Sequence, residues 1–385
     1  MSTSEVVAAI LPSVIDLRRA IHSHPELAHA ESNTTALIST FLTQQGLSPE
    51  LRKATGLTVM VGSGERLVGF RADLDALPIQ EPDGLEFRSQ VPGVMHACGH
   101  DIHASVAAGM AVAASRTELP GRIRFIFQPA EETFPGGAED LVAEGMAEGL
   151  EAIVAFHVDP TLEPGRIGFR SGPITASADR LVIKLEGPGG HTARPHRSVD
   201  LVYATGKVIT DLPAILDRTI DARLPAALVF GRVTSGSAFN VIPTSAEIAG
   251  TFRTLDHGLW AEAPVLIDRL LQEIVAPTGA KAFLDYQRGI PPVVNDEHVV
   301  AVLREAVGVA LGVEAVAPTP TSMGGEDFAN FTEKVPGALL RLGGQPSGLA
   351  ADLHSASFRV DERAIETGIK GGLAGLVGLL QHGHQ

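Results

Sequence analysis

Residues 67–75 read Leu-Val-Gly-Phe-Arg-Ala-Asp-Leu-Asp, and the predicted fold starts from this stretch. A short, mainly apolar run that ends in carboxylates is typical of a buried strand that stops at a polar site. Residues 123–132 and 153–159 repeat the pattern, since acidic residues or a histidine follow each apolar run. Ligand sites of open α/β sheets lie at the carboxyl ends of strands. The three runs therefore predict one shared crevice.

Residues 178–289 have a different pattern of predicted elements, with strands and helices in the order β-α-β-β-α-β. That order is typical of the ferredoxin-like arrangement. The expected strands cover 181–185, 226–233, 246–253 and 282–287, and the expected helices start near Ser198 and cover 259–274. We predict an α/β protein in which a larger mixed-sheet α/β/α domain, residues 1–177 and 290–385, carries residues 178–289 as an inserted, smaller ferredoxin-like α+β domain. Helical spacing also predicts helices over 6–21, over 104–115 and from Asp361 onward.

The composition limits the possible partners. The 385 residues are 44% hydrophobic and carry a net charge of −15, whereas nucleic-acid binding needs clustered Lys and Arg. No apolar stretch approaches the ~20 residues that span a bilayer, and the N-terminus does not resemble a secretory signal. Cys98 is the only cysteine, so an internal disulfide is impossible and a reducing compartment fits. We expect a cytoplasmic protein whose partners are neither nucleic acid nor membrane.

The densest cluster of potential ligands is residues 96–103, His-Ala-Cys-Gly-His-Asp-Ile-His. Thiolate and imidazole are the usual ligands of zinc-like ions. One alternative is a small buried cysteine beside a histidine-rich surface loop. Another is a structural zinc site, which would usually need several cysteines. One cysteine with scattered histidines and carboxylates favours an open, catalytic metal site.

Further candidates lie where predicted strands stop or in later loops. Glu131 and Glu132 leave a strand together, and adjacent residues there point in different directions. One carboxylate can then bind metal while the other faces the reacting water, although a solvated acidic pair is the alternative. His157 follows the next strand and His354 lies in a later loop, and from spacing alone either could equally be structural or on the surface.

The inserted domain contributes three polar candidates. His191 follows two glycines, Asn240 lies between Phe239 and Val241, and Arg253 lies at a strand end. Each could reach a polar substrate, but a loop histidine, a structural hydrogen bond and a surface charge are the alternatives.

These segments together resemble the M20 family of metallopeptidases, in particular its amidohydrolase branch of hippurate hydrolases, bacterial aminoacylases and plant indole-acetyl-amino-acid hydrolases. The match covers nearly the whole chain in the family's order and is highly specific as a set. It implies that residues 178–289 are an inserted ferredoxin-like α+β lid domain on a catalytic domain of residues 1–177 and 290–385. The matching segments are HSHPEL at 22–27, RADLDALPIQE at 71–81, HACGHDIH at 96–103, FQPAEE at 127–132, GGHTARPH at 189–196, NVIP at 240–243, GTFRT at 250–254, GGEDF at 324–328 and LHS at 353–355.

The resemblance implies a site that holds two divalent metal ions. Cys98 would bridge the ions. His100 and His157 would complete one ion's ligands, and Glu132 and His354 those of the other. Thiolate and imidazole favour Zn²⁺, whereas the carboxylate and open positions leave room for Mn²⁺, Co²⁺ or Ni²⁺.

This chain departs from many M20 peptidases, which bridge with an aspartate and take an early ligand from a His-x-Asp motif. Asp73 and Asp75 occupy that early place, and Cys98 stands where the bridge belongs. These departures favour the amidohydrolase branch. Asp75 is then expected to orient a ligand, and Asp73 to lie outside the ligand set.

The implied reaction is hydrolysis of the amide bond of a small N-acyl-amino acid, of the hippurate or N-acetyl type. Glu131 would be the general base. His191, helped by Asn240, would stabilise the oxyanion, and Arg253 would hold the substrate carboxylate. The alternatives are a dipeptidase or an N-acyl-diaminopimelate deacylase on the same scaffold, or a binding protein without turnover. Similar enzymes often dimerise through the lid, so we expect a homodimer in which His191 serves its own or the partner's active site.

Overall fold

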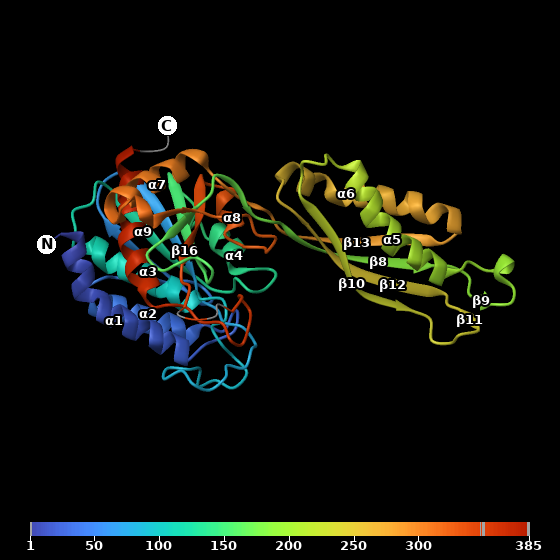
Figure 1. Cartoon of the computed structure of the whole chain (residues 1–385), viewed down its shortest axis with the longest axis horizontal. Helices are drawn as coiled ribbons and strands as arrows, with labels where there is room; N and C mark the ends of the chain where they lie inside the picture. Colours follow the sequence, from blue (N-terminus) through green and yellow to red (C-terminus); the bar gives the residue numbers. More distant parts are fainter. Residues whose placement is uncertain (1, 347, 349–350, 383–385) are drawn as a thin grey trace. The chain divides into compact units, whose positions relative to one another are not determined.

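The computed structural model describes residues 2–346, 348 and 351–382, and the chain forms two compact units (Figure 1). The first unit comprises Met1–Ile174, Val294–Pro320 and Asp327–Gln385. The second unit comprises Thr175–Val293 and Thr321–Glu326. The second unit therefore comes mainly from the middle of the chain, and the first unit is built from the segments on both sides of it.

A mixed sheet of eight strands forms the centre of the described first unit, in the order β1-β2-β4-β3-β5-β16-β6-β15. These strands are β1 (Glu50–Leu51), β2 (Leu57–Gly62), β3 (Leu67–Asp73), β4 (Arg122–Gln128), β5 (Ala152–Asp159), β6 (Ile167–Phe169), β15 (Val316–Pro318) and β16 (Gly337–Gly343). The central strands β4, β3, β5 and β16 are parallel, whereas β2 and β6 run antiparallel to β4 and β16. Burial on both faces explains why β3 and β5 are continuous apolar runs. The predicted α/β class with a mixed sheet is confirmed.

Helices cover this sheet. They are α1 (Thr3–Ser23), α2 (Ser32–Gln44), α3 (His100–Ser115), α4 (Gly137–Ala143), α7 (Glu297–Leu311), α8 (Ala329–Thr332) and α9 (Arg363–His382), with a 3-10 turn at Val313–Ala315. α3 packs against α9 on the central strands, with α1 against α3 and α7 against α9 (Figure 1). A Cβ on Gly109 of α3 would lie only 2.4 Å from Cδ1 of Ile369, so close packing of α3 and α9 needs glycine there. Within the described residues, no helix is long and apolar enough to cross a membrane.

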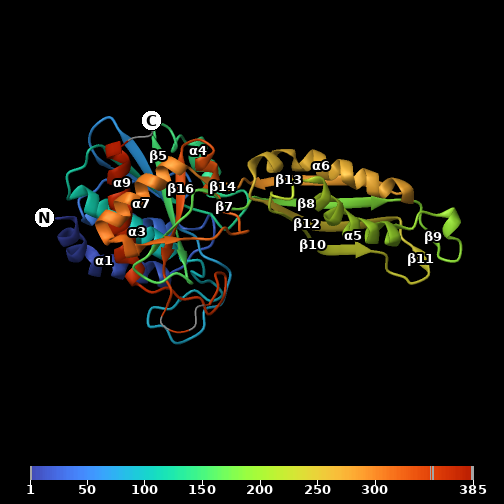
Figure 2. The same ribbon diagram turned by 45° about the horizontal axis from the view of Figure 1, so that its top comes forward.

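The described second unit has an antiparallel sheet of four strands in the order β10-β12-β8-β13, and two helices lie on one face of it (Figure 2). Its elements are β8 (Ala178–Glu186), α5 (Leu201–Thr219), β10 (Ala226–Ser235), β12 (Ser245–Thr254), α6 (His257–Val275) and β13 (Lys281–Ile290), with 3-10 turns at Pro195–Arg197 and Ala276–Thr278. Two further pairs of short strands occur among the described residues. β9 (Gly190–His191) pairs with β11 (Val241–Ile242) in the second unit, and β7 (Gly172–Thr175) pairs with β14 (Val293–Asn295), mainly in the first unit. Every second residue of β8 is buried, as expected for a sheet with one covered face. Each strand and helix predicted for residues 178–289 is present.

Two of the element boundaries that differ from the prediction concern candidate ligands. The strand predicted to end before His157 continues to Asp159, because β5 keeps pairing with β16, so His157 lies inside the strand and not after it. The helix expected from Ala104 begins at His100. The apolar runs did not indicate either extension, because the added residues are largely polar.

Candidate metal centre

The carboxyl ends of β3, β4 and β5 lie at one edge of the first unit's sheet, because these neighbouring strands are parallel. Asp75 follows β3, Glu131 and Glu132 follow β4, and His157 lies near the end of β5. The predicted convergence of the three strand ends is confirmed.

The turn that starts α3 brings Cys98 and His100 to this same edge. Gly99, between them, has a φ of 89°, a left-handed conformation that side chains disfavour. A Cβ at this position would also lie 2.3 Å from Cγ2 of Val158. Gly99 therefore allows Val158 of β5 to pack closely on the turn, which keeps Cys98 and His100 beside His157.

Five side chains form two groups of potential metal ligands that share the sulfur of Cys98. The donor atoms of Cys98, His100 and His157 lie within 4.8 Å of one another. Those of Cys98, Glu132 and His354 satisfy the same limit. The Sγ of Cys98 is 3.4 Å from Nε2 of His157, and Oε1 of Glu132 is 3.0 Å from Nε2 of His354. The structure thus brings together all five residues that the sequence predicted as ligands.

The electrostatics of this cluster suit a divalent cation. Burial raises the pKa of the Cys98 thiol to about 12, so a thiolate there needs a bound cation. Burial and the charge of Arg341 lower the pKa of His157 well below its usual value, so its ring is neutral, the form that can bind a metal. Neither ring nitrogen of His100 has a hydrogen-bond partner of good geometry among the described residues, although Nδ1 lies 3.3 Å from Oδ1 of Asp75. Buried ring nitrogens left open beside a thiol and a carboxylate fit a metal site.

The carboxylate of Asp75 fixes the turn that carries the two glutamates. Its Oδ1 accepts the backbone N–H of Glu131 at 3.0 Å, and its Oδ2 accepts that of Glu132 at 2.9 Å. Burial acts to raise the pKa of Asp75, but the nearby ring of His100 and the backbone N–H groups of Glu132 and Glu131 outweigh it and lower the pKa. Asp75 is therefore ionised, and it orients the glutamate turn as well as the histidine.

Two residues in the loops of this centre have positive φ angles, 57° at Ala130 and 60° at His354. Such a conformation costs a non-glycine residue about 1–3 kcal/mol. The N–H of Ala130 donates to Oε1 of Glu31 at 2.8 Å, and the N–H of His354 donates to the carbonyl of Ala97 at 2.9 Å. These bonds hold the loops in place. Sequence reasoning missed Glu31, because no spacing connects it with a loop 99 residues away.

The three candidates from the predicted lid lie in the second unit. The β9–β11 pair sets His191 opposite Val241, next to Asn240, and both candidate side chains are exposed. Arg253 is half-buried on β12 and donates through Nη1 to the carbonyl of Met323 at 2.9 Å. The structure thus brings His191 and Asn240 together and leaves Arg253 elsewhere on the sheet. Their contacts with a substrate stay a prediction.

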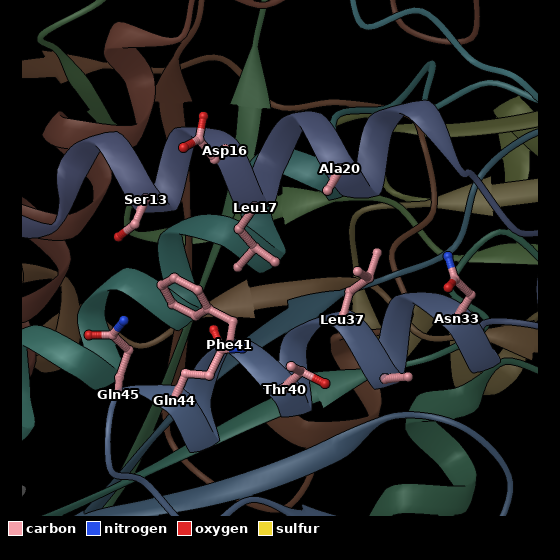
Figure 3. Close-up of a pocket in the computed structure, with 11 residues that line it drawn as sticks. Ser13, Asp16, Leu17, Ala20, Asn33, Leu37, Thr40, Phe41, Gln44 and Gln45 are labelled. Carbon is pink, nitrogen blue, oxygen red and sulfur yellow. The ribbon is translucent and has the colours of Figure 1, made fainter.

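A surface groove between α1 and α2 is separate from this centre (Figure 3). Its volume is about 420 Å³, and its lining includes the apolar side chains Leu17, Leu37 and Phe41 beside polar residues such as Asp16. None of the 11 lining residues is a candidate ligand, so the groove has no part in the metal chemistry.

The model of peptidase family M20/M25/M40 matches residues 69–374, and the chain belongs to this family. An N-acyl-L-amino acid amidohydrolase of Geobacillus stearothermophilus is 40% identical over 75% of this chain and 80% of that protein. A crystal structure of a dinuclear metal-binding M20 peptidase from Bacillus subtilis has a TM-score of 0.86 at 33% identity, over 97% of this chain and 99% of that one. The protein is a metal-dependent hydrolase that acts on amide bonds.

A protein of Rhodococcus jostii that carries the name of a glutamate–cysteine ligase is 45% identical over 93% of this chain. The chain spans 45% of the length of that protein, so the match concerns less than half of it.

Proposed function

We propose that this protein hydrolyses the amide bond of N-acyl-amino acids and releases a carboxylic acid and a free amino acid. The observation that carries the proposal is the pair of ligand groups that share Cys98, since it suits two ions bridged by one thiolate. The 40% identity with an N-acyl-L-amino acid amidohydrolase supports this substrate class.

The five clustered side chains would hold the two ions. Cys98 would bridge them, with His100 and His157 on one ion and Glu132 and His354 on the other. This mixture of thiolate, imidazole and carboxylate suits zinc and also manganese, cobalt or nickel. When bound, two such ions lower the pKa of a water and polarise the carbonyl of the substrate.

Glu131 would carry out the proton transfers. Asp75 fixes the backbone of Glu131 through a hydrogen bond, and Oε2 of Glu131 lies 3.9 Å from Nε2 of His100. The side chain of Glu131 is 11% exposed, so water can reach its carboxylate. Glu131 takes a proton from the attacking water as general base and returns it to the leaving nitrogen as general acid. The carboxylate therefore ends the reaction in the protonation state in which it started.

The second unit would contribute the contacts with the substrate. We interpret residues 178–289 as a ferredoxin-like lid inserted into a catalytic domain of residues 1–177 and 290–385. His191, with Asn240 beside it, would donate to the oxyanion. Arg253 would bind the carboxylate of the substrate.

The spacing of these residues along the second unit favours a homodimer. Arg253 lies near the end of β12, eight residues after Ser245, whereas His191 belongs to β9, whose partner β11 precedes the start of β12. An antiparallel strand rises about 3.4 Å per residue, so the backbones of Ser245 and Arg253 lie roughly 27 Å apart, and β9 with β11 continues beyond the Ser245 end of β12. One small substrate cannot touch both within one chain. We therefore propose that each subunit supplies His191 to the active site of the other.

A substrate panel on the metal-loaded protein tests the proposal. The panel contains hippurate, N-acetyl-amino acids, N-acyl-diaminopimelate and dipeptides, with zinc or manganese. We expect the wild type to prefer N-acyl-amino acids, whereas preference for dipeptides or for N-acyl-diaminopimelate would favour the corresponding alternative. Bound metal without any turnover would favour a binding protein.

The variant Glu131→Gln tests the assigned base. It should keep two ions per subunit in elemental analysis and lose about 10²–10⁴-fold in kcat, because the amide cannot accept the proton. The matched control is Glu118→Gln, an exposed glutamate beyond the end of α3, which should keep full activity. An active Glu131→Gln variant would show that another group is the base.

A further inference from the structure

His103 is not among the five proposed ligands, yet it is buried beside them. It lies three residues after His100 on α3, so the two side chains share one helix face. Asp73, His100 and His103 form a third group whose donor atoms lie within 4.8 Å of one another. The hydrogen bonds of His103 decide whether it is a metal ligand or has another role.

Both ring nitrogens of His103 are engaged within the protein. Nδ1 lies 2.6 Å from Oδ1 of Asp73, and Nε2 lies 2.8 Å from the backbone nitrogen of Val158. A backbone N–H can only donate, so Nε2 must be the unprotonated acceptor. The ring hydrogen is then on Nδ1, which donates to Asp73. A ring without a free lone pair cannot bind an ion, so this third group is not a metal site.

The N–H of Val158 needs this acceptor because the strand beside it has ended. The N–H of Ile153 bonds on the β16 side, and N–H groups alternate along a strand, so the N–H of Val158 faces β3. The pairing of β5 with β3 stops at Ala155. His103 therefore takes the place of a missing strand residue, and Asp73, the last residue of β3, holds it there.

The carbonyl of Val158 orients one of the proposed ligands. It accepts the Nδ1–H of His157 at 2.8 Å. A neutral imidazole carries one ring hydrogen, so Nε2 of His157 keeps its lone pair and lies 3.4 Å from the sulfur of Cys98. Both polar backbone groups of Val158 are thus occupied, the N–H by His103 and the carbonyl by His157.

We propose that His103 is a positioning residue that, held by Asp73, fixes the backbone of Val158 and so directs Nε2 of His157 toward its metal ion. The proposal rests on the proposed function, because that function makes His157 a ligand. Groups that orient a metal ligand typically change metal affinity by about 10–100-fold. The two histidines of one helix face therefore have different roles, His100 as ligand and His103 as the support of another ligand.

Two variants separate the hydrogen bonds of His103. In His103→Asn the amide can still donate to Asp73 but is too short to reach Val158. In His103→Gln the longer side chain can place its oxygen near the position of Nε2. In a chelator-competition titration with zinc we expect two ions in the wild type, one of them bound about 10–100-fold more weakly in His103→Asn, and partial recovery in His103→Gln. The control Val112→Ala, a buried residue more than two turns further along α3, should lower stability and keep both affinities.

A measurement on the wild type keeps the test decisive even if a variant does not fold. Nitrogen NMR shifts of the metal-free protein should show His103 protonated at Nδ1 and unprotonated at Nε2. The opposite tautomer, or unchanged zinc affinities in a folded His103→Asn, would overturn the positioning role. A wild type with this tautomer and two bound ions that hydrolyses no N-acyl-amino acid would support the positioning role and overturn the proposed function.

Discussion

The two units place several of their candidate residues in opposite environments, although His354 of the first unit is exposed. In the first unit Cys98, His100 and His157 are buried, and other buried groups surround them. In the second unit His191 and Asn240 are exposed. Buried polar groups have to find partners within the fold, so the folding of one chain determines the geometry of the metal centre. Exposed groups have no such constraint, and their proposed roles depend on what they meet when subunits associate.

Replacing an exposed residue should therefore separate turnover from metal binding, and this gives the largest expected effect. His191→Ala should lower kcat by about 10²–10³-fold, the typical cost of removing one oxyanion donor. Elemental analysis should still find two ions per subunit, and the melting temperature should be unchanged because the side chain is exposed. Loss of metal in this variant would contradict the division of roles between the units.

Mixing two inactive variants sharpens the same comparison. Cys98→Ala lacks the proposed bridging thiolate, and His191→Ala lacks the proposed oxyanion donor. If His191 serves the other subunit, each mixed dimer has one site with both residues intact, and an equal mixture recovers about a quarter of the wild-type activity. Action of His191 within its own subunit predicts no recovery.

The next largest expected effect is a loss of stability when a buried ion pair of the first unit is broken. Asp101 is fully buried, 2.7 Å from Nε of Arg18 and 2.8 Å from Nδ1 of His22. Burial acts to raise the pKa of Asp101, but the charges of Arg18 and His22 outweigh it and hold the pKa well below the usual range. A carboxyl group whose pKa is lower in the folded than in the unfolded protein stabilises the fold at any pH above its unfolded pKa of about 3.9. This contribution is lost as the pH falls through the folded pKa.

Asp101→Asn should therefore lower the free energy of unfolding of the metal-free protein by about 3–5 kcal/mol at neutral pH, because it leaves Arg18 without a buried partner carboxylate at this position. The difference from the wild type should shrink as the pH falls below about 4. Urea unfolding at both pH values measures it. A difference that stays constant with pH would mean that the charge of Asp101 is not what stabilises the fold.

The sequence predicted the elements of both units well, for a physical reason. Strands buried on both faces are continuous apolar runs, as in β3 and β5, and the half-exposed strand β8 alternates. What the sequence did not predict is how far β5 extends through polar residues. That length depends on pairing with β16, which follows it by more than 170 residues.

The candidate ligands were predictable, but most of the groups that hold them were not. Thiolate and imidazole were recognisable as potential metal ligands where they cluster at 96–103, whereas His157 and His354 were assigned only through the family resemblance. The hydrogen bonds from the N–H of Ala130 to Glu31 and from the N–H of Val158 to His103 join residues 99 and 55 positions apart. Partners of this kind depend on which loops meet in space, and residue type alone does not reveal them. For His103 the spacing of three residues from His100 on a helix was an available signal.

The stability of the second unit should depend on pH in the opposite direction, and this is the smallest of the expected effects. The hydroxyl of Tyr286 donates to Oδ2 of Asp179 at 2.6 Å. Burial and this hydrogen bond raise the pKa of Tyr286 above its usual value of about 10. A group whose pKa is higher in the folded than in the unfolded protein stabilises the fold at any pH below its unfolded pKa. This contribution is lost as the pH rises through the folded pKa. Alkali should thus weaken the second unit through Tyr286, whereas acid weakens the first through Asp101.

Tyr286→Phe should lower the free energy of unfolding by about 1 kcal/mol near pH 8, the typical value of one hydrogen bond, and leave metal binding unchanged. Its further loss of stability toward pH 11 should be smaller than that of the wild type, because phenylalanine does not titrate. Denaturant unfolding at the two pH values, with metal content measured in parallel, tests both statements. Equal alkaline losses in the variant and the wild type would show that another group makes the protein sensitive to alkali, and the contrast between the two units would then rest on Asp101 alone.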